Sequence, residues 1–140
     1  MQGKCLCGRG EFEVRDAPRK LYQCHCSLCR KQSGTASNAS LIVRSDQFVW
    51  LAGQDLVSSY VRPTGFRSDF CSRCGSPVPN QLRGTSYVWV PAGLLDESSP
   101  LEVAMHLFVG SKASWEPAPV SGALHEEVPA FAELLKVLRS

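Results

Sequence analysis

The sequence predicts an all-β fold with one short helix near the C-terminal end, and two observations favour this class. Short segments in which apolar and polar residues alternate, or in which β-branched and aromatic residues gather, follow one another along most of the chain. Turn-forming residues separate them, and the 140 residues include 11 glycines and 9 prolines. The length is typical of one domain, so we expect residues 1–140 to form a single domain.

Eight segments are expected to form strands. In the first, Phe12 and Val14 lie on one face, because side chains alternate along a strand. Ser45-Asp46 predicts a turn between the third and the fourth, and Pro63-Thr64-Gly65 ends the fifth. The segments are residues 11–15, 21–26, 40–44, 47–51, 57–61, 66–70, 86–90 and 102–109.

The predicted helix lies near the C-terminal end. Pro129 is suited to the first turn of a helix, and apolar residues at helical spacing follow it. These residues are Phe131, Leu134, Leu135 and Leu138. A small β domain with many turns has a modest core, so a bound metal ion would add stability.

Charge and hydropathy exclude several classes of partner. The chain has 15 Lys and Arg against 13 Asp and Glu, a net charge of +2, so we expect no nucleic-acid partner. No apolar run approaches the roughly 20 residues that span a bilayer, so we expect no membrane association. Residues 1–5 lack the apolar core of a signal peptide, and we expect a cytoplasmic protein.

The cysteines are the most informative residues. Their number, seven, is odd, so a framework of disulfides would leave one thiol over. Cytoplasmic thiols stay reduced, which favours metal binding or catalysis. The cysteines form three groups, Cys5-Leu6-Cys7, Cys24-His25-Cys26-Ser27-Leu28-Cys29 and Cys71-Ser72-Arg73-Cys74.

The first and third groups together predict a closed zinc site. Cys5 and Cys7 point the same way in an extended backbone, because side chains alternate. Cys71 and Cys74 are brought together by a tight turn that Gly75 follows, as in a zinc knuckle. Four cysteines make a tetrahedral, structural zinc site. The alternative is that these pairs form disulfides or remain unused thiols.

The second group predicts a zinc site with an open position. Cys24 and Cys26 face one way on a strand, and Cys29 returns through a two-residue turn. Three protein ligands leave a coordination position for water or substrate, which is the catalytic arrangement. His25 lies between two ligands and should point to the opposite face, as a hydrogen-bonded structural histidine. The alternative is a wholly structural site, completed by His106 or His125.

These motifs together resemble the glutathione-dependent formaldehyde-activating enzyme family, which also includes centromere protein V-like members. The resemblance covers nearly the whole chain in the right order, and the combination of cysteine motifs is highly specific. It rests on Cys5-Leu6-Cys7-Gly8, on residues 24–34 from Cys24 to Gly34, on residues 70–77 from Phe70 to Pro77, on residues 89–96, on His106-Leu107-Phe108 and on Ser111-Lys112-Ala113-Ser114-Trp115.

The resemblance implies a twisted β-sandwich of the β-tent type, stapled by two zinc ions per chain. It implies a structural zinc ion on Cys5, Cys7, Cys71 and Cys74. It also implies a catalytic zinc ion on Cys24, Cys26 and Cys29. The implied activity is that of a carbon–sulfur lyase that joins glutathione, or a similar small thiol, to formaldehyde or another small aldehyde.

The expected mechanism begins with a thiol that binds the open zinc position, loses its proton and attacks the aldehyde carbon. Cations beside the site would stabilise the developing alkoxide or hold a substrate carboxylate. Arg30 and Lys31 directly follow the metal loop, and Ser33 and Gly34 form a tight loop beside it. The expected substrate contacts are Arg30, Ser33, Gly34, Lys112 and Trp115.

Two other functions remain open at this point. A non-catalytic zinc module would bind a protein or nucleic acid, and a fourth protein ligand on the second zinc ion would favour it. A zinc-thiolate redox sensor would release metal when its cysteine pairs are oxidised.

Overall fold

The computed structural model describes residues 1–96 and 100–140. The chain forms two compact units, each built from two separate stretches of sequence. The first unit comprises Met1–Ala17 and Ile42–Ser99, and the second comprises Pro18–Leu41 and Pro100–Ser140. The single zinc-binding domain expected over residues 1–140 stays a prediction.

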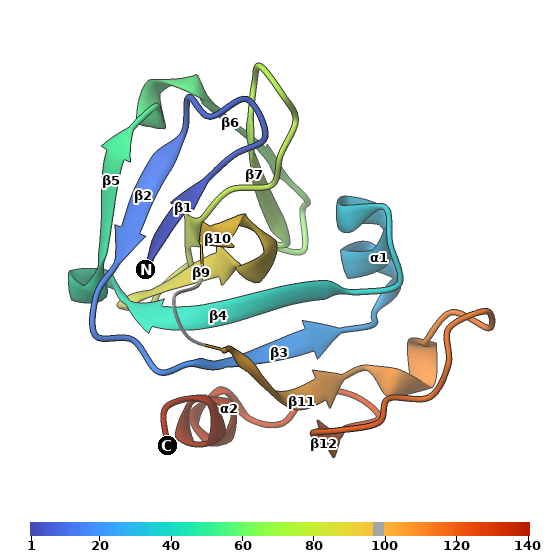
Figure 1. Cartoon of the computed structure of the whole chain (residues 1–140). Helices are drawn as coiled ribbons and strands as arrows, with labels where there is room; N and C mark the ends of the chain where they lie inside the picture. The colour runs from blue at the N-terminus through green and yellow to red at the C-terminus, as the bar shows by residue number, and fades with distance from the viewer. Residues whose placement is uncertain (97–99) are drawn as a thin grey trace. The chain divides into compact units, whose positions relative to one another are not determined.

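The first unit contains a four-stranded antiparallel sheet in the order β10-β1-β2-β5 (Figure 1). Phe12 is almost completely buried, and its ring packs on Phe48 and Trp50 with ring-centre distances of 5.5 and 5.9 Å. Gly3 is the register partner of Phe12 on the next strand, and a side chain there would overlap the Phe12 ring. The strands are β1 (Gln2–Lys4), β2 (Glu11–Val14), β5 (Phe48–Ala52) and β10 (Leu95–Asp96).

Two further strand pairs complete the first unit. An antiparallel hairpin joins β6 (Val57–Val61) to β7 (Arg67–Cys71), and β8 (Asn80–Gln81) pairs with β9 (Tyr87–Pro91). Short 3-10 turns follow the neighbouring strands, namely η1 (Ser45–Gln47), η2 (Gln54–Leu56) and η3 (Ala92–Leu94). The hairpin positions one of the candidate metal ligands, because β7 ends at Cys71.

The second unit is built on strands in the order β12-β11-β3-β4. The central pair is parallel, β3 (Lys20–Cys24) with β11 (Glu102–Leu107), and β12 (Ala123–Leu124) runs parallel to β11. The antiparallel strand β4 (Asn38–Arg44) begins in this unit. A helix, α1 (Ser27–Ser33), connects β3 to β4, and the 3-10 turn η4 (Val109–Ser111) follows β11.

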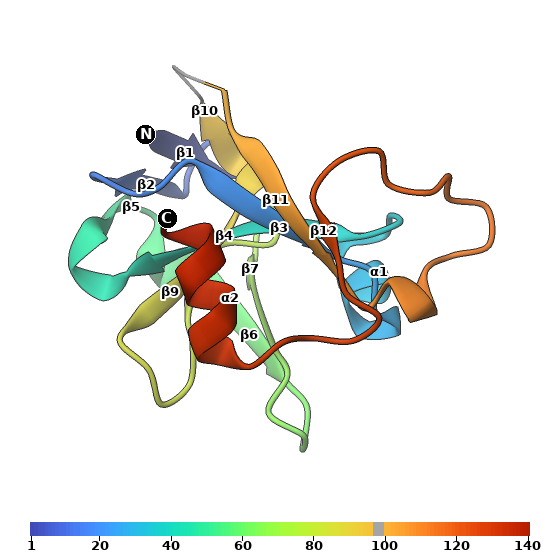
Figure 2. The same ribbon diagram turned by 90° about the horizontal axis from the view of Figure 1, so that it is seen from below.

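The C-terminal helix α2 (Phe131–Leu138) packs against β3 in the second unit (Figure 2). Leu134 and Leu138 are buried, as the apolar spacing predicts. Pro129 lies one residue before the N-cap, Ala130, and so just outside the first turn where we expected it. Within the described ranges, no helix has the length and apolar character needed to cross a membrane.

The β-rich class with a C-terminal helix is confirmed, and the differences are local. The strand expected over residues 21–26 ends at Cys24, because a helix begins directly afterwards. The strand expected over residues 102–109 ends at Leu107, because Phe108 adopts a left-handed backbone conformation, with φ of 55°. The helix α1 and the short strands β1, β8, β10 and β12 are not predicted by the sequence pattern.

Candidate metal centres

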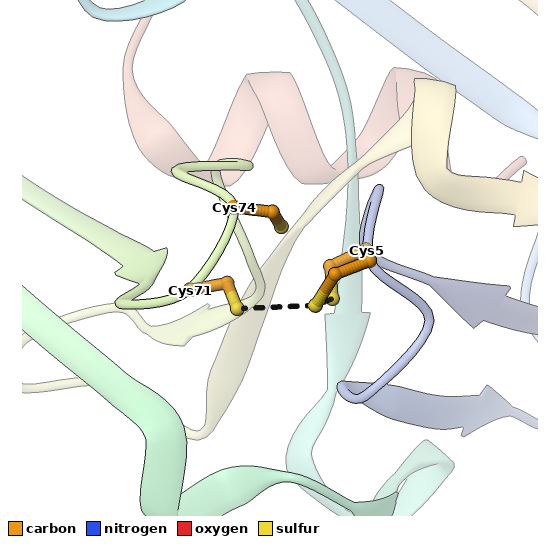
Figure 3. Close-up of side chains that lie close together, drawn as sticks. Cys5, Cys71 and Cys74 are labelled. Atoms are coloured by element: carbon orange, nitrogen blue, oxygen red, sulfur yellow. Dashed lines mark hydrogen bonds between the residues drawn. The ribbon is translucent and has the colours of Figure 1, made fainter.

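Four cysteines of the first unit form one cluster, in which all four sulfur atoms lie within 4.8 Å of one another. Cys5 and Cys7 follow β1, Cys71 ends β7, and Cys74 lies in the next turn (Figure 3). The sulfur of Cys7 is 3.6 Å from that of Cys5 and 3.8 Å from that of Cys71. A tetrahedron of metal–sulfur bonds of about 2.3 Å has edges of about 3.8 Å. The cluster can therefore hold a four-coordinate metal ion.

Backbone hydrogen bonds hold both cysteine turns of this cluster. Gly8 donates to the carbonyl of Cys5 at 2.9 Å, and Gly75 donates to that of Cys71 at 2.8 Å. Both glycines have φ of 77°, which other residues adopt only with strain. The Ser76 hydroxyl accepts a hydrogen bond from the Leu6 backbone at 2.9 Å, which ties the two turns together.

The cysteines of this first cluster differ in acidity. The Ser76 hydroxyl, 3.4 Å from the sulfur of Cys74, lowers the pKa of that thiol to about 5 by hydrogen bonding. Burial acts to raise the pKa of Cys5, but hydrogen bonds from Gly10 and from neighbouring thiols lower it overall. A hydrogen bond from the Arg9 backbone acts to lower the pKa of Cys7. Partial desolvation and the neighbouring sulfurs outweigh it and raise this pKa to about 11. The lowered pKa values of Cys5 and Cys74 favour their negatively charged thiolate forms, which a cation site requires.

Three cysteines of the second unit form the other cluster, with their sulfur atoms also within 4.8 Å of one another. Cys24 is the last residue of β3, Cys26 is the N-cap of α1, and Cys29 lies in the first turn of that helix. The Cys29 backbone N–H donates to the Cys26 sulfur at 3.3 Å, as it would to a serine or aspartate cap. The two-residue turn that we expected before Cys29 is therefore wrong, because a capped helix brings Cys29 back to its partners.

The second cluster concentrates negative charge on one sulfur. A hydrogen bond from Cys29 lowers the pKa of Cys24 to about 6, and the same interaction raises the pKa of Cys29. Cys24 and Cys29 are buried, whereas Cys26 is half-buried. Within residues 1–96 and 100–140, only these three cysteines bring ligand atoms together at this place.

Two histidines of the second unit, His25 and His106, are engaged in hydrogen bonds away from the cysteine sulfurs. His25 is completely buried, with Nδ1 at 3.0 Å from Glu116 Oε2 and Nε2 at 2.9 Å from His106 Nδ1. His106 Nε2 donates to the carbonyl of Ser121 at 2.9 Å. Both ring nitrogens of His25 and of His106 are thus hydrogen-bonded. His25 has the structural environment that we expected, and neither His106 nor His125 belongs to the ligand cluster.

The Ser121 carbonyl, at one end of this series of hydrogen bonds, determines which ring nitrogens donate and which accept. Burial lowers the pKa of His106, so this side chain is neutral near pH 7. Because its Nε2 must carry the proton donated to Ser121, its Nδ1 accepts from His25 Nε2–H. His25 Nδ1 and the Glu116 carboxylate then share one further proton.

The expected substrate contacts all lie in the second unit, in two groups. Ser33 and Gly34 end α1, where the Ser33 hydroxyl donates to the carbonyl of Cys29 at 2.9 Å and Gly34 is the C-cap. Arg30 is half-buried, and its Nε atom is buried without a hydrogen-bond partner.

The second group follows η4. The Lys112 ammonium donates to the carbonyl of Glu116 at 2.6 Å, so this side chain stabilises its own turn. Trp115 is 69% exposed. Lys31, the other cation considered beside the metal loop, is exposed.

Sequence reasoning missed two polar residues beside the second cluster. Glu116 lies directly after the family-like segment, and the signal for it was His25, which needed a hydrogen-bond partner once buried. Asn38 is the register partner of Cys24 on β4, and its amide donates to Gln32 of α1 at 2.9 Å. Asn38 Oδ1 is buried without a partner. No local pattern in the sequence points to Asn38.

The fold and the two cysteine clusters define a β-rich protein with two sites that can hold metal ions. The sequence profile of the family described as "Glutathione-dependent formaldehyde-activating enzyme" matches residues 1–111. That stretch contains all seven cysteines. The chain belongs to this family of enzymes. The match ends before Lys112 and Trp115, so their resemblance to the family lies outside it.

A curated relative agrees with this membership, and a solved structure shares the fold. A Halomonas elongata protein, whose name assigns it provisionally to the glutathione-dependent formaldehyde-activating enzymes, is 28% identical over 123 residues. The alignment covers 82% of this chain and 78% of that protein. A crystal structure of a Rhodobacter sphaeroides protein is similar in fold, with a TM-score of 0.57 and 24% identity. That match covers 71% of this chain and 92% of the other.

Proposed function

We propose that each cysteine cluster binds one zinc ion, and that the chain forms and breaks a carbon–sulfur bond between a thiol and a small aldehyde. The observation that carries this proposal is the composition of the second cluster, where three sulfurs gather with no fourth ligand among the described residues. Three protein ligands leave one position on zinc for a substrate, whereas four close the site. Family membership supports glutathione and formaldehyde as the substrates.

The proposed role of the first zinc site is structural. Cys5 and Cys71 are buried and pack with Val78 in an apolar cluster. Zinc on Cys5, Cys7, Cys71 and Cys74 would join the loop after β1 to the turn at the end of β7. Cys7 and Cys71 are 64 positions apart in the sequence. A cross-link that closes so long a loop removes much chain entropy from the unfolded state.

The proposed role of the second site is catalytic. When bound by Cys24, Cys26 and Cys29, zinc would lower the pKa of a thiol placed at its open position and so supply a thiolate nucleophile. The three cysteine sulfurs would hold the ion, and the capped start of α1 fixes the position of Cys29 relative to Cys26. This arrangement suits an incoming sulfur better than the activation of water, because three thiolates already donate charge to the ion.

The proposed reaction is balanced without an oxidant or reductant. The thiolate sulfur attacks the aldehyde carbon, a carbon–sulfur bond forms, and the electron pair of the C=O π bond moves to the oxygen. The resulting alkoxide takes up the proton that the thiol released, which gives a hemithioacetal, S-hydroxymethylglutathione for glutathione and formaldehyde. In the reverse direction the hydroxyl loses its proton and the thiolate leaves.

Arg30 is the residue that we propose to stabilise the developing alkoxide or a substrate carboxylate. Its buried Nε has no protein partner, so one donor of a permanently charged group remains unsatisfied beside Cys29. Ser33, Gly34, Lys112 and Trp115 are the other proposed substrate contacts. The exposed indole of Trp115 offers an apolar surface to the thiol substrate.

We also propose that residues 1–140 act as one zinc-binding domain in the cytoplasm, where cysteine thiols stay reduced and small thiols are available.

The test is a metal analysis combined with adduct detection. The wild-type chain should contain two zinc ions and should accelerate the formation of S-hydroxymethylglutathione, followed by NMR, beyond the spontaneous rate. Cys29→Ser should retain the fold and one zinc ion but lose the acceleration. Ser27→Ala, which changes an exposed hydroxyl of the same helix, is the matched control and should behave like the wild type.

Other outcomes would favour the other functions. Two tightly bound zinc ions without any acceleration would favour a non-catalytic interaction module. Reversible release of zinc by dilute peroxide, again without acceleration, would favour a redox sensor.

A further inference from the structure

We propose that Glu116 and His106 are positioning residues for the second metal site, and that they act by fixing His25 between the two ligands Cys24 and Cys26. The inference rests on the proposed function only in so far as the second cluster binds a metal ion. It concerns residues outside the cysteine motifs, and Glu116 lies outside the matched stretch of the family profile.

His25 is held by hydrogen bonds at its backbone and at both ring nitrogens. Its backbone N–H donates to the carbonyl of Leu107 at 2.9 Å, and its two ring nitrogens bond to Glu116 and His106. The backbone and both ends of the side chain are thus fixed, and the residue is completely buried. Because His25 is covalently joined to Cys24 and Cys26, this arrangement also fixes the direction in which the two thiols leave the backbone.

The partners of His25 are themselves held by further hydrogen bonds. His106 belongs to β11, beside β3, and its outer ring nitrogen donates to the Ser121 carbonyl. The Glu116 side chain is only 15% exposed, and its backbone carbonyl accepts from Lys112. The segment between Lys112 and Ser121 is therefore tied to the metal loop at two points.

The orientation of Cys24 and Cys26 by His25 has a consequence for metal binding. A tetrahedral site requires its sulfurs at fixed separations, and residues that orient the ligands change metal affinity by about 10- to 100-fold when they are mutated. Without Glu116, the buried His25 Nδ1 would lose its partner and the ring would turn or take up water. We expect the second site to weaken, while the first site, in the other unit, stays as it is.

The experiment is a cobalt titration of the whole chain, because Co²⁺ replaces zinc in thiolate sites and its visible spectrum distinguishes four sulfurs from three sulfurs and an oxygen. Glu116→Ala should weaken Co²⁺ binding at the three-sulfur site by about 10- to 100-fold and leave the four-sulfur site within about 2-fold. Glu116→Gln keeps a hydrogen-bond partner for His25 Nδ1, because its amide N–H can donate to the neutral ring, and should restore binding to within about 3-fold of the wild type. Glu127→Ala, which removes an exposed carboxylate eleven positions further along the chain, is the matched control.

Wild-type affinity at the three-sulfur site of Glu116→Ala, or equal weakening at both sites, would overturn the proposal. If Glu116→Ala does not fold, Glu116→Asp takes its place, since it keeps the charge but is one methylene too short to reach His25. A chain that binds cobalt as described but forms no thiol adduct would contradict the proposed function and leave this inference intact. Adduct formation by the wild type, together with unchanged cobalt affinity in the variants, would support the proposed function and contradict this inference.

Discussion

At the scale of single residues, Cys26 has two separate roles that one substitution can distinguish. Its sulfur belongs to the three-cysteine cluster and also caps α1 by accepting the N–H of Cys29. Serine is a good helix cap but a poor zinc ligand, whereas alanine is neither.

We therefore predict that Cys26→Ser and Cys26→Ala both lose metal from the second site but differ in the stability of the metal-free chain. Cys26→Ala should be less stable than Cys26→Ser by about 1 kcal/mol, the usual contribution of a helix cap. Urea unfolding of both metal-free variants measures this difference. Equal midpoints would show that a hydrogen-bond acceptor at position 26 does not stabilise α1 as a cap.

Glycine is required at position 3 because a neighbouring ring occupies the space of a side chain, and not because of an unusual backbone angle. A Cβ atom there would overlap the ring of Phe12, whereas a Cβ atom on Gly93 would meet nothing within 4 Å. We predict that Gly3→Ala destabilises the chain by about 1–3 kcal/mol, because the buried ring has to shift. Gly93→Ala should lie within about 0.5 kcal/mol of the wild type in the same thermal unfolding measurement. A stable Gly3→Ala variant would contradict the described packing.

At the scale of elements, α2 depends on its buried face. Leu138 is 1% exposed and Val137, its neighbour in sequence, is 37% exposed. Truncation of a buried leucine typically costs about 2–5 kcal/mol, since the cavity that remains is not refilled. We predict a loss in this range for Leu138→Ala and less than about 1 kcal/mol for Val137→Ala, both measured by urea unfolding. Similar losses for the two variants would argue against the described orientation of the helix.

The elements that sequence analysis missed share a physical cause. The seven residues of α1 show no repeated apolar spacing, and their helix is defined at its ends by the Cys26 cap and by Gly34, whose φ is 70°. The strands β8, β10 and β12 have two residues each, too few to show a pattern of their own, and each exists through pairing with another strand. Periodicity detects neither kind of element. The longer strands and α2 were predicted because their own side chains are patterned.

The candidate metal sites could likewise be predicted only in part from the sequence. The cysteine spacings revealed both clusters, because each ligand pair is local and a CxC or CxxC pattern brings its own two sulfurs together. Glu116 reaches His25 across 91 positions of sequence, and no spacing rule extends over such a separation. The buried state of His25, which demands a partner for each ring nitrogen, was the only indication.

At the scale of the whole molecule, each unit carries one cysteine cluster, so the two sites can be studied independently. We predict that a strong chelator removes zinc in two steps. The first ion to leave should be that on the three-cysteine site, because it has one protein ligand fewer. Circular dichroism should change little in that step and more in the second, when the structural site empties. Release of both ions in one step would contradict this order.

The central claim is that seven cysteines divide into four that close one zinc site and three that leave the other open. Zinc X-ray absorption of the fully loaded chain tests it most directly, because the method counts the sulfur neighbours of zinc. Seven sulfurs over two ions predict an average of about 3.5 sulfurs per zinc ion, with oxygen as the remaining neighbour. Addition of glutathione should raise the average toward about 4. A shell that is already complete with sulfur or histidine nitrogen, and that glutathione does not change, would contradict the claim.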